Sequence, residues 1–375
     1  MPNIYLDNAA TTPLIPEVEQ RIRESLSLYG NPSSLHTLGF DAEKVISRVR
    51  ESLARLLGAG QVVFTASGSE ANNLALLSGA EKNRRAGNRI ITTDSEHPSV
   101  LECCRELERR GFELVYLSTR GGRIDMNELE AALDTPVCLV SVMHTNNETG
   151  AIYPVAEISK RVKKRYPRAL IHSDCVQAFL KDSFTLSGLG VDMVSVSAHK
   201  VHALKGVGAL ALAKPLPLSP VIFGGGQEKG LRSGTENTVG IVSLGASVET
   251  LARDRERVER ISALSDKLVT LLSEVYGVSL NLPEKKSPTV TNLSVNGIRS
   301  ETLLHALSAR GIFVSSGSAC SSKAKTSSVL EAFGLDKSGL EGAVRVSLSG
   351  LNTEDEIEAF VTALKEEIQR LKGNR

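Results

Sequence analysis

The sequence predicts an α/β protein: a large domain with a mostly parallel sheet covered by helices on both faces, and a smaller α+β C-terminal domain. Three observations predict it. Apolar segments of strand length alternate with amphipathic helical segments from residue 61 to residue 196. This alternation ends before prolines 215, 217 and 220 and the three glycines 224–226. The 375 residues also exceed the ~250–300 at which one hydrophobic core usually stops growing.

In chain order, an extended segment at 4–13 comes first, and a helix at 16–28 follows with Pro16 in its first turn. A longer helix at 36–57 is closed by Gly58. After these come the alternating elements: strands at 61–65, 89–93, 112–117, 137–142, 169–173 and 191–196, and helices at 69–86, 99–110, 126–133 and 155–166.

The C-terminal third predicts the second domain. Residues 238–276 are largely helical, and strands are expected near 289–295 and 343–348. The last helix begins at Thr353, with Glu356 completing a capping box. We therefore predict a large domain at 14–255 and a small domain made of 1–13 and 256–375.

Composition and charge exclude several classes of protein. The 44 basic and 43 acidic residues give a net charge of +1, which provides no electrostatic case for binding nucleic acid or a membrane surface. No apolar run approaches the ~20 residues of a membrane span, and the N-terminus lacks the pattern of a signal peptide, so we expect a cytoplasmic protein. The five cysteines form no C-x-x-C pair, which argues against a zinc ribbon or a disulfide framework.

Lys200 is the first candidate catalytic residue. It ends Ser197-Ala198-His199-Lys200, which follows the apolar strand at 191–196. The carboxyl edge of a parallel sheet is where such folds place their chemistry. A lysine that is partly desolvated there becomes a nucleophile toward carbonyl groups. An ordinary surface lysine is the alternative, and the neighbouring loops decide against it.

Three other loops leave strands at the same edge. Ala66-Ser67-Gly68-Ser69-Glu70 joins a strand to a helix and is typical of an anion site, although it is neither a P-loop nor a dinucleotide motif. Asp174 and Gln177 follow one strand and His97 follows another. Each has a structural alternative, as a cap or a solvated side chain. Together with Lys200 they form the set that pyridoxal phosphate needs: a Schiff-base lysine, a carboxylate for the pyridine nitrogen and a phosphate cradle.

Cys320 is the candidate nucleophile. It lies in Ser315-Ser316-Gly317-Ser318-Ala319-Cys320-Ser321-Ser322, among small polar residues, and lysines at 323 and 325 favour a thiolate. Cysteines 103, 104, 138 and 175 lie in helical or strand contexts and are interpreted as structural.

These motifs resemble those of the cysteine desulfurases, pyridoxal-phosphate enzymes of the aspartate-aminotransferase fold (fold type I, class V aminotransferases). The resemblance covers nearly the whole chain. It rests on motifs in the same order: 5–12 (Tyr-Leu-Asp-Asn-Ala-Ala-Thr-Thr), 30–34 (Gly-Asn-Pro-Ser-Ser), 69–73 (Ser-Glu-Ala-Asn-Asn), 96–98 (Glu-His-Pro), 143–150 (Met-His-Thr-Asn-Asn-Glu-Thr-Gly), 197–200, 224–228 (Gly-Gly-Gly-Gln-Glu), 232–237 (Arg-Ser-Gly-Thr-Glu-Asn) and 317–322.

The resemblance implies a role for each matching residue. Lys200 would form the Schiff base and move protons, Asp174 would pair with the pyridine nitrogen, Gln177 with the ring hydroxyl, and His97 would stack on the ring. The phosphate would be held by Gly68, Ser69, Ser197 and His199, joined by Thr235 of a second subunit. Asn147 would contact cofactor and substrate, and the substrate carboxylate would bind Asn31 and Arg345. Cys320 would attack the substrate sulfur, leaving alanine and an enzyme persulfide.

The resemblance also implies the partners: L-cysteine, a second copy of the chain in a homodimer, and a sulfur acceptor such as an iron–sulfur scaffold or a tRNA-thiolation protein. No direct nucleic-acid partner, no membrane and no catalytic metal are expected. Three stretches depart from the family pattern: Ala66-Ser67 in place of Ser-Gly, His202-Ala203-Leu204 in place of an aromatic residue, glycine and proline, and a shorter stretch after Cys320, Lys325-Thr326-Ser327-Ser328.

Two other functions remain open on the sequence alone. One is an enzyme of the same fold without sulfur chemistry, such as an aminotransferase or a kynureninase-like hydrolase, against which Cys320 argues. The other is a catalytically weakened homologue that acts as a partner or regulator in sulfur assembly. Changes at 202–204 favour this second alternative, whereas Lys200, Asp174, His97 and Cys320 argue against it.

Overall fold

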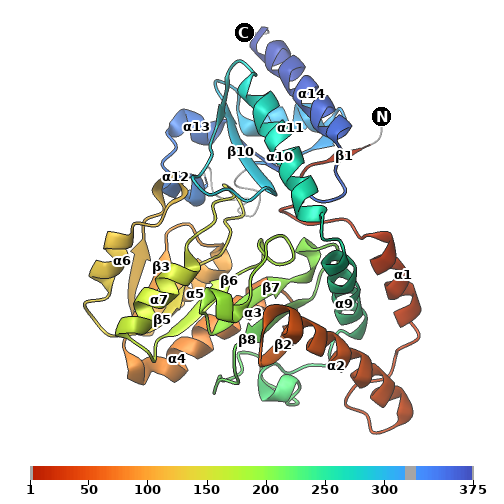
Figure 1. The fold of residues 1–375 in the computed structure, drawn as a ribbon, viewed down its shortest axis with the longest axis vertical. Coiled ribbons are helices and arrows are strands. Elements are labelled where there is room, and N and C mark those ends of the chain that lie inside the picture. The colour runs from red at the N-terminus through yellow and green to blue at the C-terminus, as the bar shows by residue number, and fades with distance from the viewer. Residues whose placement is uncertain (1–2, 317–326, 374–375) are drawn as a thin grey trace.

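The computed structural model describes residues 3–316 and 327–373, which form an α/β part and a smaller part above it in Figure 1. The α/β part is built on a seven-stranded sheet with the order β2-β8-β7-β6-β5-β3-β4. Its strands are β2 (Gln61–Thr65), β3 (Arg89–Thr93), β4 (Glu113–Leu117), β5 (Val137–Ser141), β6 (Leu170–Asp174), β7 (Met193–Ser197) and β8 (Gly208–Leu212). All neighbours pair in parallel except β8, which is antiparallel to both β2 and β7. The predicted mostly parallel sheet is confirmed.

Helices cover both faces of this sheet, and each face has its own apolar core. In β2, Val62 and Phe64 belong to one core and Val63 to the other, as the two-residue period of a strand requires. The helices of this part are α1 (Pro16–Ser25), α2 (Thr37–Leu57), α5 (Pro98–Arg109), α6 (Met126–Ala132), α7 (Val155–Arg165), α8 (Leu186–Leu189) and α9 (Thr238–Arg253), with short 3₁₀ turns η3 (Arg120–Gly122), η4 (Ala198–Lys200) and η5 (Glu228–Gly230). The helix predicted at 16–28 is shorter than expected and ends at Ser25.

The helix predicted at 69–86 is present, but its hydrogen bonding changes along its length. It consists of α3 (Gly68–Asn73), a π-helical turn η1 (Leu74–Ser78), α4 (Gly79–Asn83) and a final 3₁₀ turn η2 (Arg84–Ala86). The start of α3 follows directly on β2, as the predicted anion-binding turn requires.

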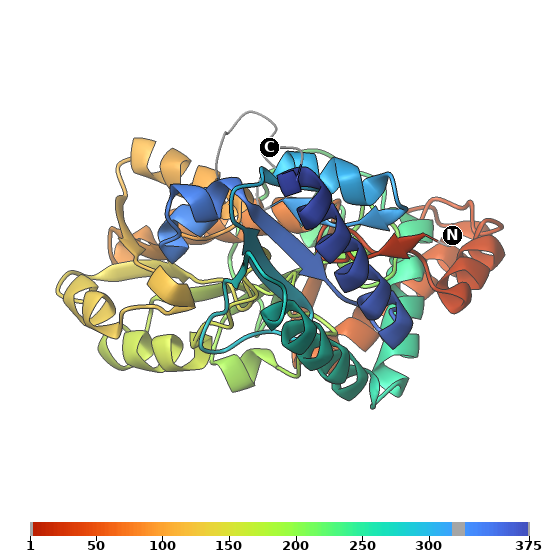
Figure 2. The same ribbon diagram turned by 90° about the horizontal axis from the view of Figure 1, so that it is seen from above.

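The smaller part is α+β, as predicted. Its four-stranded antiparallel sheet has the order β12-β13-β10-β9, and a parallel pair joins β1 to β11. The strands are β1 (Ile4–Tyr5), β9 (Val278–Leu280), β10 (Val290–Val295), β11 (Ile312–Phe313), β12 (Ser315–Ser316) and β13 (Ala343–Ser347), and the helices are α10 (Arg257–Ser273), α11 (Ser300–Ser308), α12 (Ser328–Phe333), α13 (Lys337–Glu341) and α14 (Glu354–Gly373). Figure 2 shows α10 and α14 lying over this sheet.

Leu6 belongs to the apolar core of the smaller part, together with side chains between Ile261 and Ile368. This core is separate from the two cores of the large sheet. The separation supports the predicted division into 14–255 and 1–13 with 256–375, which we retain as a prediction.

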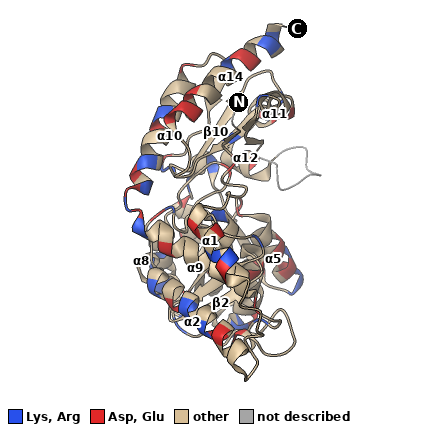
Figure 3. Cartoon of the chain, turned by 90° about the vertical axis from the view of Figure 1, so that its right-hand side faces the viewer, with Lys and Arg blue, Asp and Glu red and all other residues tan. Residues whose placement is uncertain are grey.

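Charge is mixed over the surface. Acidic residues (red) and basic residues (blue) both occur along α1, α10 and α14 in Figure 3. Among residues 3–316 and 327–373, no helix is long and apolar enough to cross a bilayer.

Candidate active site

A cavity of about 300 Å³ lies at the carboxyl edge of the large sheet, a volume at the lower end of the range for small-molecule sites. The ends of β2, β6 and β7 supply one wall and the N-terminal segment supplies another. Most of the predicted site residues line it: Gly68, Ser69, His97, Asn147, Asp174, Gln177, Ser197, His199, Lys200 and Arg345.

Lys200 reaches this cavity from the 3₁₀ turn η4, immediately after β7. Its Nζ donates to the carbonyl oxygens of Ala9 and Ala10, each at 2.7 Å. The ammonium group is therefore held between the sheet edge and the N-terminal segment, and Lys200 lines the cavity.

Asp174 is the last residue of β6 and is buried. Its Oδ2 accepts from Asn72 Nδ2 at 2.7 Å and its Oδ1 from the backbone N–H of Val176 at 3.0 Å. These two donors fix the orientation of the carboxylate group of Asp174, which lines the cavity.

His97 is the N-cap residue of α5. Its Nδ1 lies 2.8 Å from Ser99 Oγ and 3.1 Å from the backbone nitrogen of Ser99. Burial lowers the pKa of the imidazole, Asp174 opposes this shift and Lys200 adds to it. The ring is therefore neutral at physiological pH.

The predicted phosphate turn begins with Ser67, whose Oγ accepts the backbone N–H of Glu70 at 3.1 Å and so caps α3. The first N–H groups of a helix have no partner within the helix, so those of Gly68 and Ser69 are available to an anion. Ser67 has φ of −168°, an extended conformation open to any residue, so the family's glycine is not required there. Gly208 of β8 is required by close approach, because a Cβ would lie 2.4 Å from the carbonyl carbon of Ser67.

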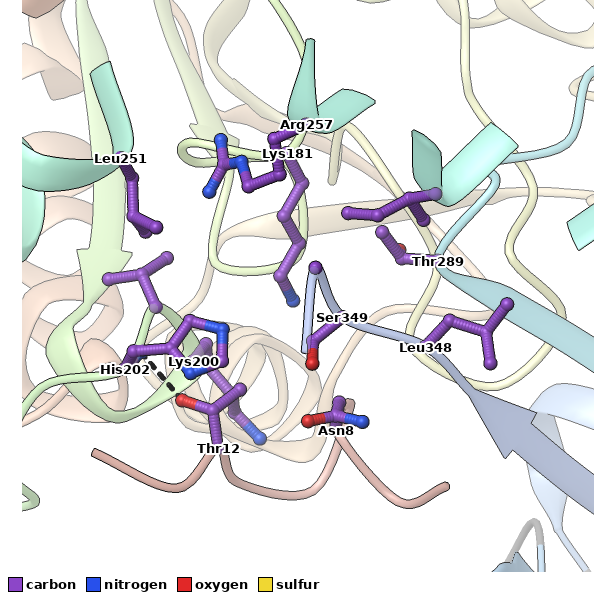
Figure 4. Close-up of a pocket in the computed structure, with 13 residues that line it drawn as sticks. Asn8, Thr12, Lys181, Lys200, His202, Leu251, Arg257, Thr289, Leu348 and Ser349 are labelled. Atoms are coloured by element: carbon purple, nitrogen blue, oxygen red, sulfur yellow. Dashed lines mark hydrogen bonds between the residues drawn. The ribbon is translucent and has the colours of Figure 1, made fainter. Parts of the chain in front are cut away.

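Gln177 is held by a lysine that the sequence did not single out. Lys181 Nζ donates to Gln177 Oε1 at 2.8 Å, and Gln177 Nε2 donates to the carbonyl oxygen of Ala9 at 2.9 Å. Lys181 points into a second cavity of about 20 Å³ behind Lys200 (Figure 4), which Arg257 also lines. Burial, with Lys200, Arg345 and Arg257 nearby, lowers the pKa of Lys181 to about 7.

Arg345 enters from β13 of the smaller part and is 4% exposed. Its Nη1 donates to the carbonyl oxygen of Asn147 at 3.0 Å, and its Nη2 donates to Asp7 Oδ1 at 2.8 Å. The guanidinium group thus joins the N-terminal segment, the smaller part and the cavity.

Three predicted residues are not in the cavity. Asn31 and Thr235 are exposed and do not line the cavity of their own chain. Cys320 lies outside the described residues. The predicted functions of these three stay predictions.

Burial confirms the structural interpretation of the other four cysteines. It raises the pKa of the Cys103 and Cys138 thiols to about 12 and raises those of Cys104 and Cys175 further. Cys175 is next to Asp174, yet its thiol donates to Ser173 Oγ at 3.6 Å and does not line the cavity. None of these four is a thiolate at neutral pH.

The change at 202–204 is accommodated without glycine or proline. His202 has φ of +64°, a left-handed conformation that histidine tolerates better than most residues. Its backbone N–H donates to Thr12 Oγ1 at 2.6 Å, and its Nδ1 lies 2.8 Å from the carbonyl oxygen of Pro13. Ala203 has no positive φ and is buried, so alanine fits where the family commonly has glycine.

The cavity fits pyridoxal phosphate on the chemistry of its unsatisfied groups. Four buried polar atoms on its wall have no hydrogen-bond partner among the described residues: Asn72 Oδ1, Asn147 Oδ1, Ser197 Oγ and Arg345 Nε. Buried polar atoms are normally paired, so these atoms are available to the polar groups of a ligand. Within the described part of the chain, no group of histidine, cysteine or carboxylate side chains could hold a metal ion.

Sequence reasoning missed the supporting residues Asn72, Ser99 and Lys181. Asn72, near the end of α3, and Ser99, at the start of α5, both line the cavity. Lys181 lies in the turn that follows β6, where no sequence motif marks it.

Comparisons with known proteins identify the family of this chain. The family model of the class-V aminotransferases matches residues 4–360. A cysteine desulfurase of Trichormus azollae is 41% identical over 382 aligned positions, covering 99% of this chain and 94% of that protein. A solved NifS-like protein has a TM-score of 0.91 at 37% identity, covering 98% of this chain and 99% of that one. A structure of SspA in complex with cysteine has a TM-score of 0.80 at 33% identity, covering 93% and 99%. The chain therefore belongs to the class-V aminotransferases and, among them, to the pyridoxal-phosphate-dependent cysteine desulfurases.

Proposed function

We propose that this cysteine desulfurase takes the sulfur of L-cysteine onto Cys320 as a persulfide, releases L-alanine, and passes the sulfur to an acceptor protein. The observation that carries this proposal is the convergence of Lys200, Asp174, His97 and Arg345 on one cavity with unsatisfied polar walls. The structure of SspA in complex with cysteine supports the choice of substrate.

The residues that hold the cofactor come from one sheet edge. Gly68, Ser69, Ser197 and His199 bind its phosphate, Asp174 faces its ring nitrogen, and Gln177 donates to its ring hydroxyl. When bound through Lys200, pyridoxal phosphate supplies the electron sink that makes the substrate's bonds labile. Burial and neighbouring lysines lower the pKa of His199 to about 4, so His199 binds phosphate as a neutral hydrogen-bond donor.

Arg345 binds the substrate carboxylate through two parallel N–H donors, with Asn31 and Asn147 completing that site. In the structure its Nη2 is paired with Asp7, and its Nε is free of partners among the described residues. A substrate carboxylate therefore meets a guanidinium group already positioned by Asp7 and by the carbonyl oxygen of Asn147.

The stretch around Cys320 starts and ends beside this cavity. Ser315 of β12 pairs with Arg345 of β13. At the other end, Ser327 Oγ donates to Glu148 Oε2 at 2.6 Å, and Glu148 follows the cavity residue Asn147. Cys320 is the fourth residue after Ser316, a reach of at most about 14 Å, so the chain length allows the thiol to approach the bound substrate.

The sulfur step uses groups of this chain. The Cys320 thiolate attacks the substrate sulfur, and the bond between that sulfur and the substrate carbon breaks. The electron pair left on the carbon takes a proton, which Lys200 or His97 delivers, and alanine forms.

The experiment compares the wild type with Cys320→Ser and Lys200→Ala by measuring alanine, sulfide with a reductant, and persulfide. Cys320→Ser should keep the cofactor and change its visible spectrum when L-cysteine is added, yet form almost no persulfide or sulfide, because a hydroxyl is a far poorer nucleophile. Lys200→Ala should lose the borohydride-reducible visible band, while exposed Lys205→Ala keeps it. Wild-type sulfide production by Cys320→Ser would refute this mechanism.

A homodimer completes the proposal, with each phosphate site receiving Thr235 from the other subunit. Thr235 is exposed and lies outside its own chain's cavity. Large apolar side chains of the α/β part are also exposed, including Tyr29 at 77% and Phe223 at 81%. A second copy would cover them. We further propose a cytoplasmic enzyme whose sulfur serves iron–sulfur cluster assembly or tRNA thiolation.

A further inference from the structure

We propose that Ser99 and Asn72 hold His97 in the neutral tautomer whose proton is on Nε2, which makes His97 a hydrogen-bond and proton donor toward the cavity. Ser99 and Asn72 are positioning residues in this inference, which rests on the proposed function of the site. The two residues link His97 to Asp174 through a continuous chain of hydrogen bonds: His97 Nδ1 to Ser99 Oγ at 2.8 Å, Ser99 Oγ to Asn72 Nδ2 at 2.8 Å, and Asn72 Nδ2 to Asp174 Oδ2 at 2.7 Å.

The donor and acceptor in each of these hydrogen bonds are determined by the carboxylate of Asp174 at one end of the series. A carboxylate oxygen only accepts, so the Asn72 amide must turn its Nδ2 toward Asp174. The second hydrogen of that nitrogen then points to Ser99 Oγ, which accepts it. The reversed amide would place two acceptor oxygens against each other.

The Ser99 hydroxyl has one proton of its own, and its remaining partner is His97 Nδ1. The backbone N–H of Ser99 donates to the same nitrogen. His97 Nδ1 thus faces two donors and must present its lone pair, so the single proton of the neutral ring is on Nε2. No hydrogen bond between described residues engages Nε2, and His97 lines the cavity.

This arrangement also opposes a second proton on the ring. A proton on Nδ1 would face the N–H of Ser99, so that hydrogen bond would be lost, and the Ser99 hydroxyl would have to change from donor to acceptor. The charged groups that act on His97 are Asp174, which favours the imidazolium ion, and Lys200, which disfavours it, and burial outweighs both. His97 therefore gives its Nε2 proton from the neutral state rather than from a cation.

The test is ¹⁵N NMR of the histidine-labelled holoenzyme, with the His97 signals assigned from a His97→Gln variant. We expect a protonated Nε2 and an unprotonated Nδ1 in the wild type. Ser99→Ala should shift the Nδ1 signal, raise the fraction of the other tautomer, and lower kcat by ~10-fold with a smaller change in KM, since the backbone donor remains. Ser99→Thr keeps the hydroxyl and should restore both the wild-type nitrogen signals and the wild-type kcat. Ser338→Ala, at the second residue of α13, is the matched control.

A wild-type His97 protonated on Nδ1, or unchanged nitrogen signals and kcat in Ser99→Ala, would overturn the inference. The NMR result does not depend on desulfurase activity. Failure of the wild type to release sulfide from L-cysteine would instead overturn the proposed function and leave the tautomer measurement intact.

Discussion

Glu96 precedes the site histidine and is completely buried. Its Oε1 accepts from Thr93 Oγ1 at 2.9 Å and from the backbone N–H of Met143 at 2.8 Å, while its Oε2 has no partner among the described residues. Burial, with Asp174 and Asp94 nearby, raises the pKa of this carboxyl group to about 8, although its two donors oppose the shift. Glu96 is therefore protonated in the folded protein at neutral pH.

This protonation predicts a pH-dependent stability at one residue. The unfolded pKa is near 4.5, so between pH 4.5 and pH 8 the folded state binds more protons, and Glu96 makes the protein less stable as pH rises. Glutamine cannot ionise, so the Glu96→Gln variant does not lose stability in this way as pH rises. The free energy of unfolding of the variant, relative to the wild type, should increase by a few kcal/mol between pH 5 and pH 8 in denaturant titrations.

The control for this measurement is Glu102→Gln, an exposed acid on α5. An equal difference between Glu96→Gln and the wild type at pH 5 and at pH 8 would show that Glu96 is already ionised in the folded protein.

Among the single residues of the site, those that follow strands could be identified from the sequence. Lys200 and Asp174 stand at strand ends, and strand ends are readable from apolar runs. Ser99 and Asn72 were not identified, because their importance depends on the start of α5 meeting the end of α3 in space. Lys181 was missed for a similar reason, since nothing local shows that its amine is buried beside Gln177.

The start of α14 is the element where local sequence and structure agree in atomic detail. The predicted capping box is confirmed, since Thr353 Oγ1 accepts the Glu356 N–H at 3.3 Å and Glu356 Oε2 accepts the Thr353 N–H at 3.1 Å. Both partners lie within four residues, so the spacing alone was enough to predict the bonds.

Thr353→Ala should loosen this helix end by about 1 kcal/mol. Amide hydrogen exchange in the first turn of α14 should then accelerate by roughly fivefold, because local opening controls exchange there. Thr270→Ala, at an exposed position inside α10, should leave the exchange of α14 unchanged. An unchanged rate in Thr353→Ala would mean that tertiary packing, and not the cap, holds the first turn.

Two features of the elements were not predictable from periodicity. The apolar pattern of β8 is the same whichever way the strand runs, so its antiparallel direction emerges only from pairing with β2 and β7. The π-helical turn at Leu74–Ser78 depends on which carbonyl each N–H selects, and side-chain spacing does not report that choice.

For the whole molecule, the proposed shared sites predict complementation between two inactive variants. Lys200→Ala and Thr235→Asp should each be inactive, the second because a carboxylate repels the phosphate. A mixed dimer holds one site with both changes and one with neither. Mixing the variants under conditions of subunit exchange should therefore restore sulfide production, up to about a quarter of wild type.

The fraction of mixed dimers, measured by pulling down a tagged Lys200→Ala subunit with untagged Thr235→Asp, gives the efficiency of subunit exchange. If Thr235 instead serves its own chain's cavity, every site in the mixed dimer is defective and no activity returns. A monomer that stays fully active at high dilution would contradict the dimer itself.

The pairing of β1 with β11 determines when one wall of the cofactor site can form during translation. The first strand emerges about 300 residues before its partner, and at about 5–20 residues per second it waits unpaired for roughly 15 to 60 s. All seven strands of the large sheet are synthesised within that interval. Ala9 and Ala10, whose carbonyl oxygens hold Lys200, stand only a few residues after β1. The nascent chain can therefore fix this wall of the cofactor site only after β11 has been translated.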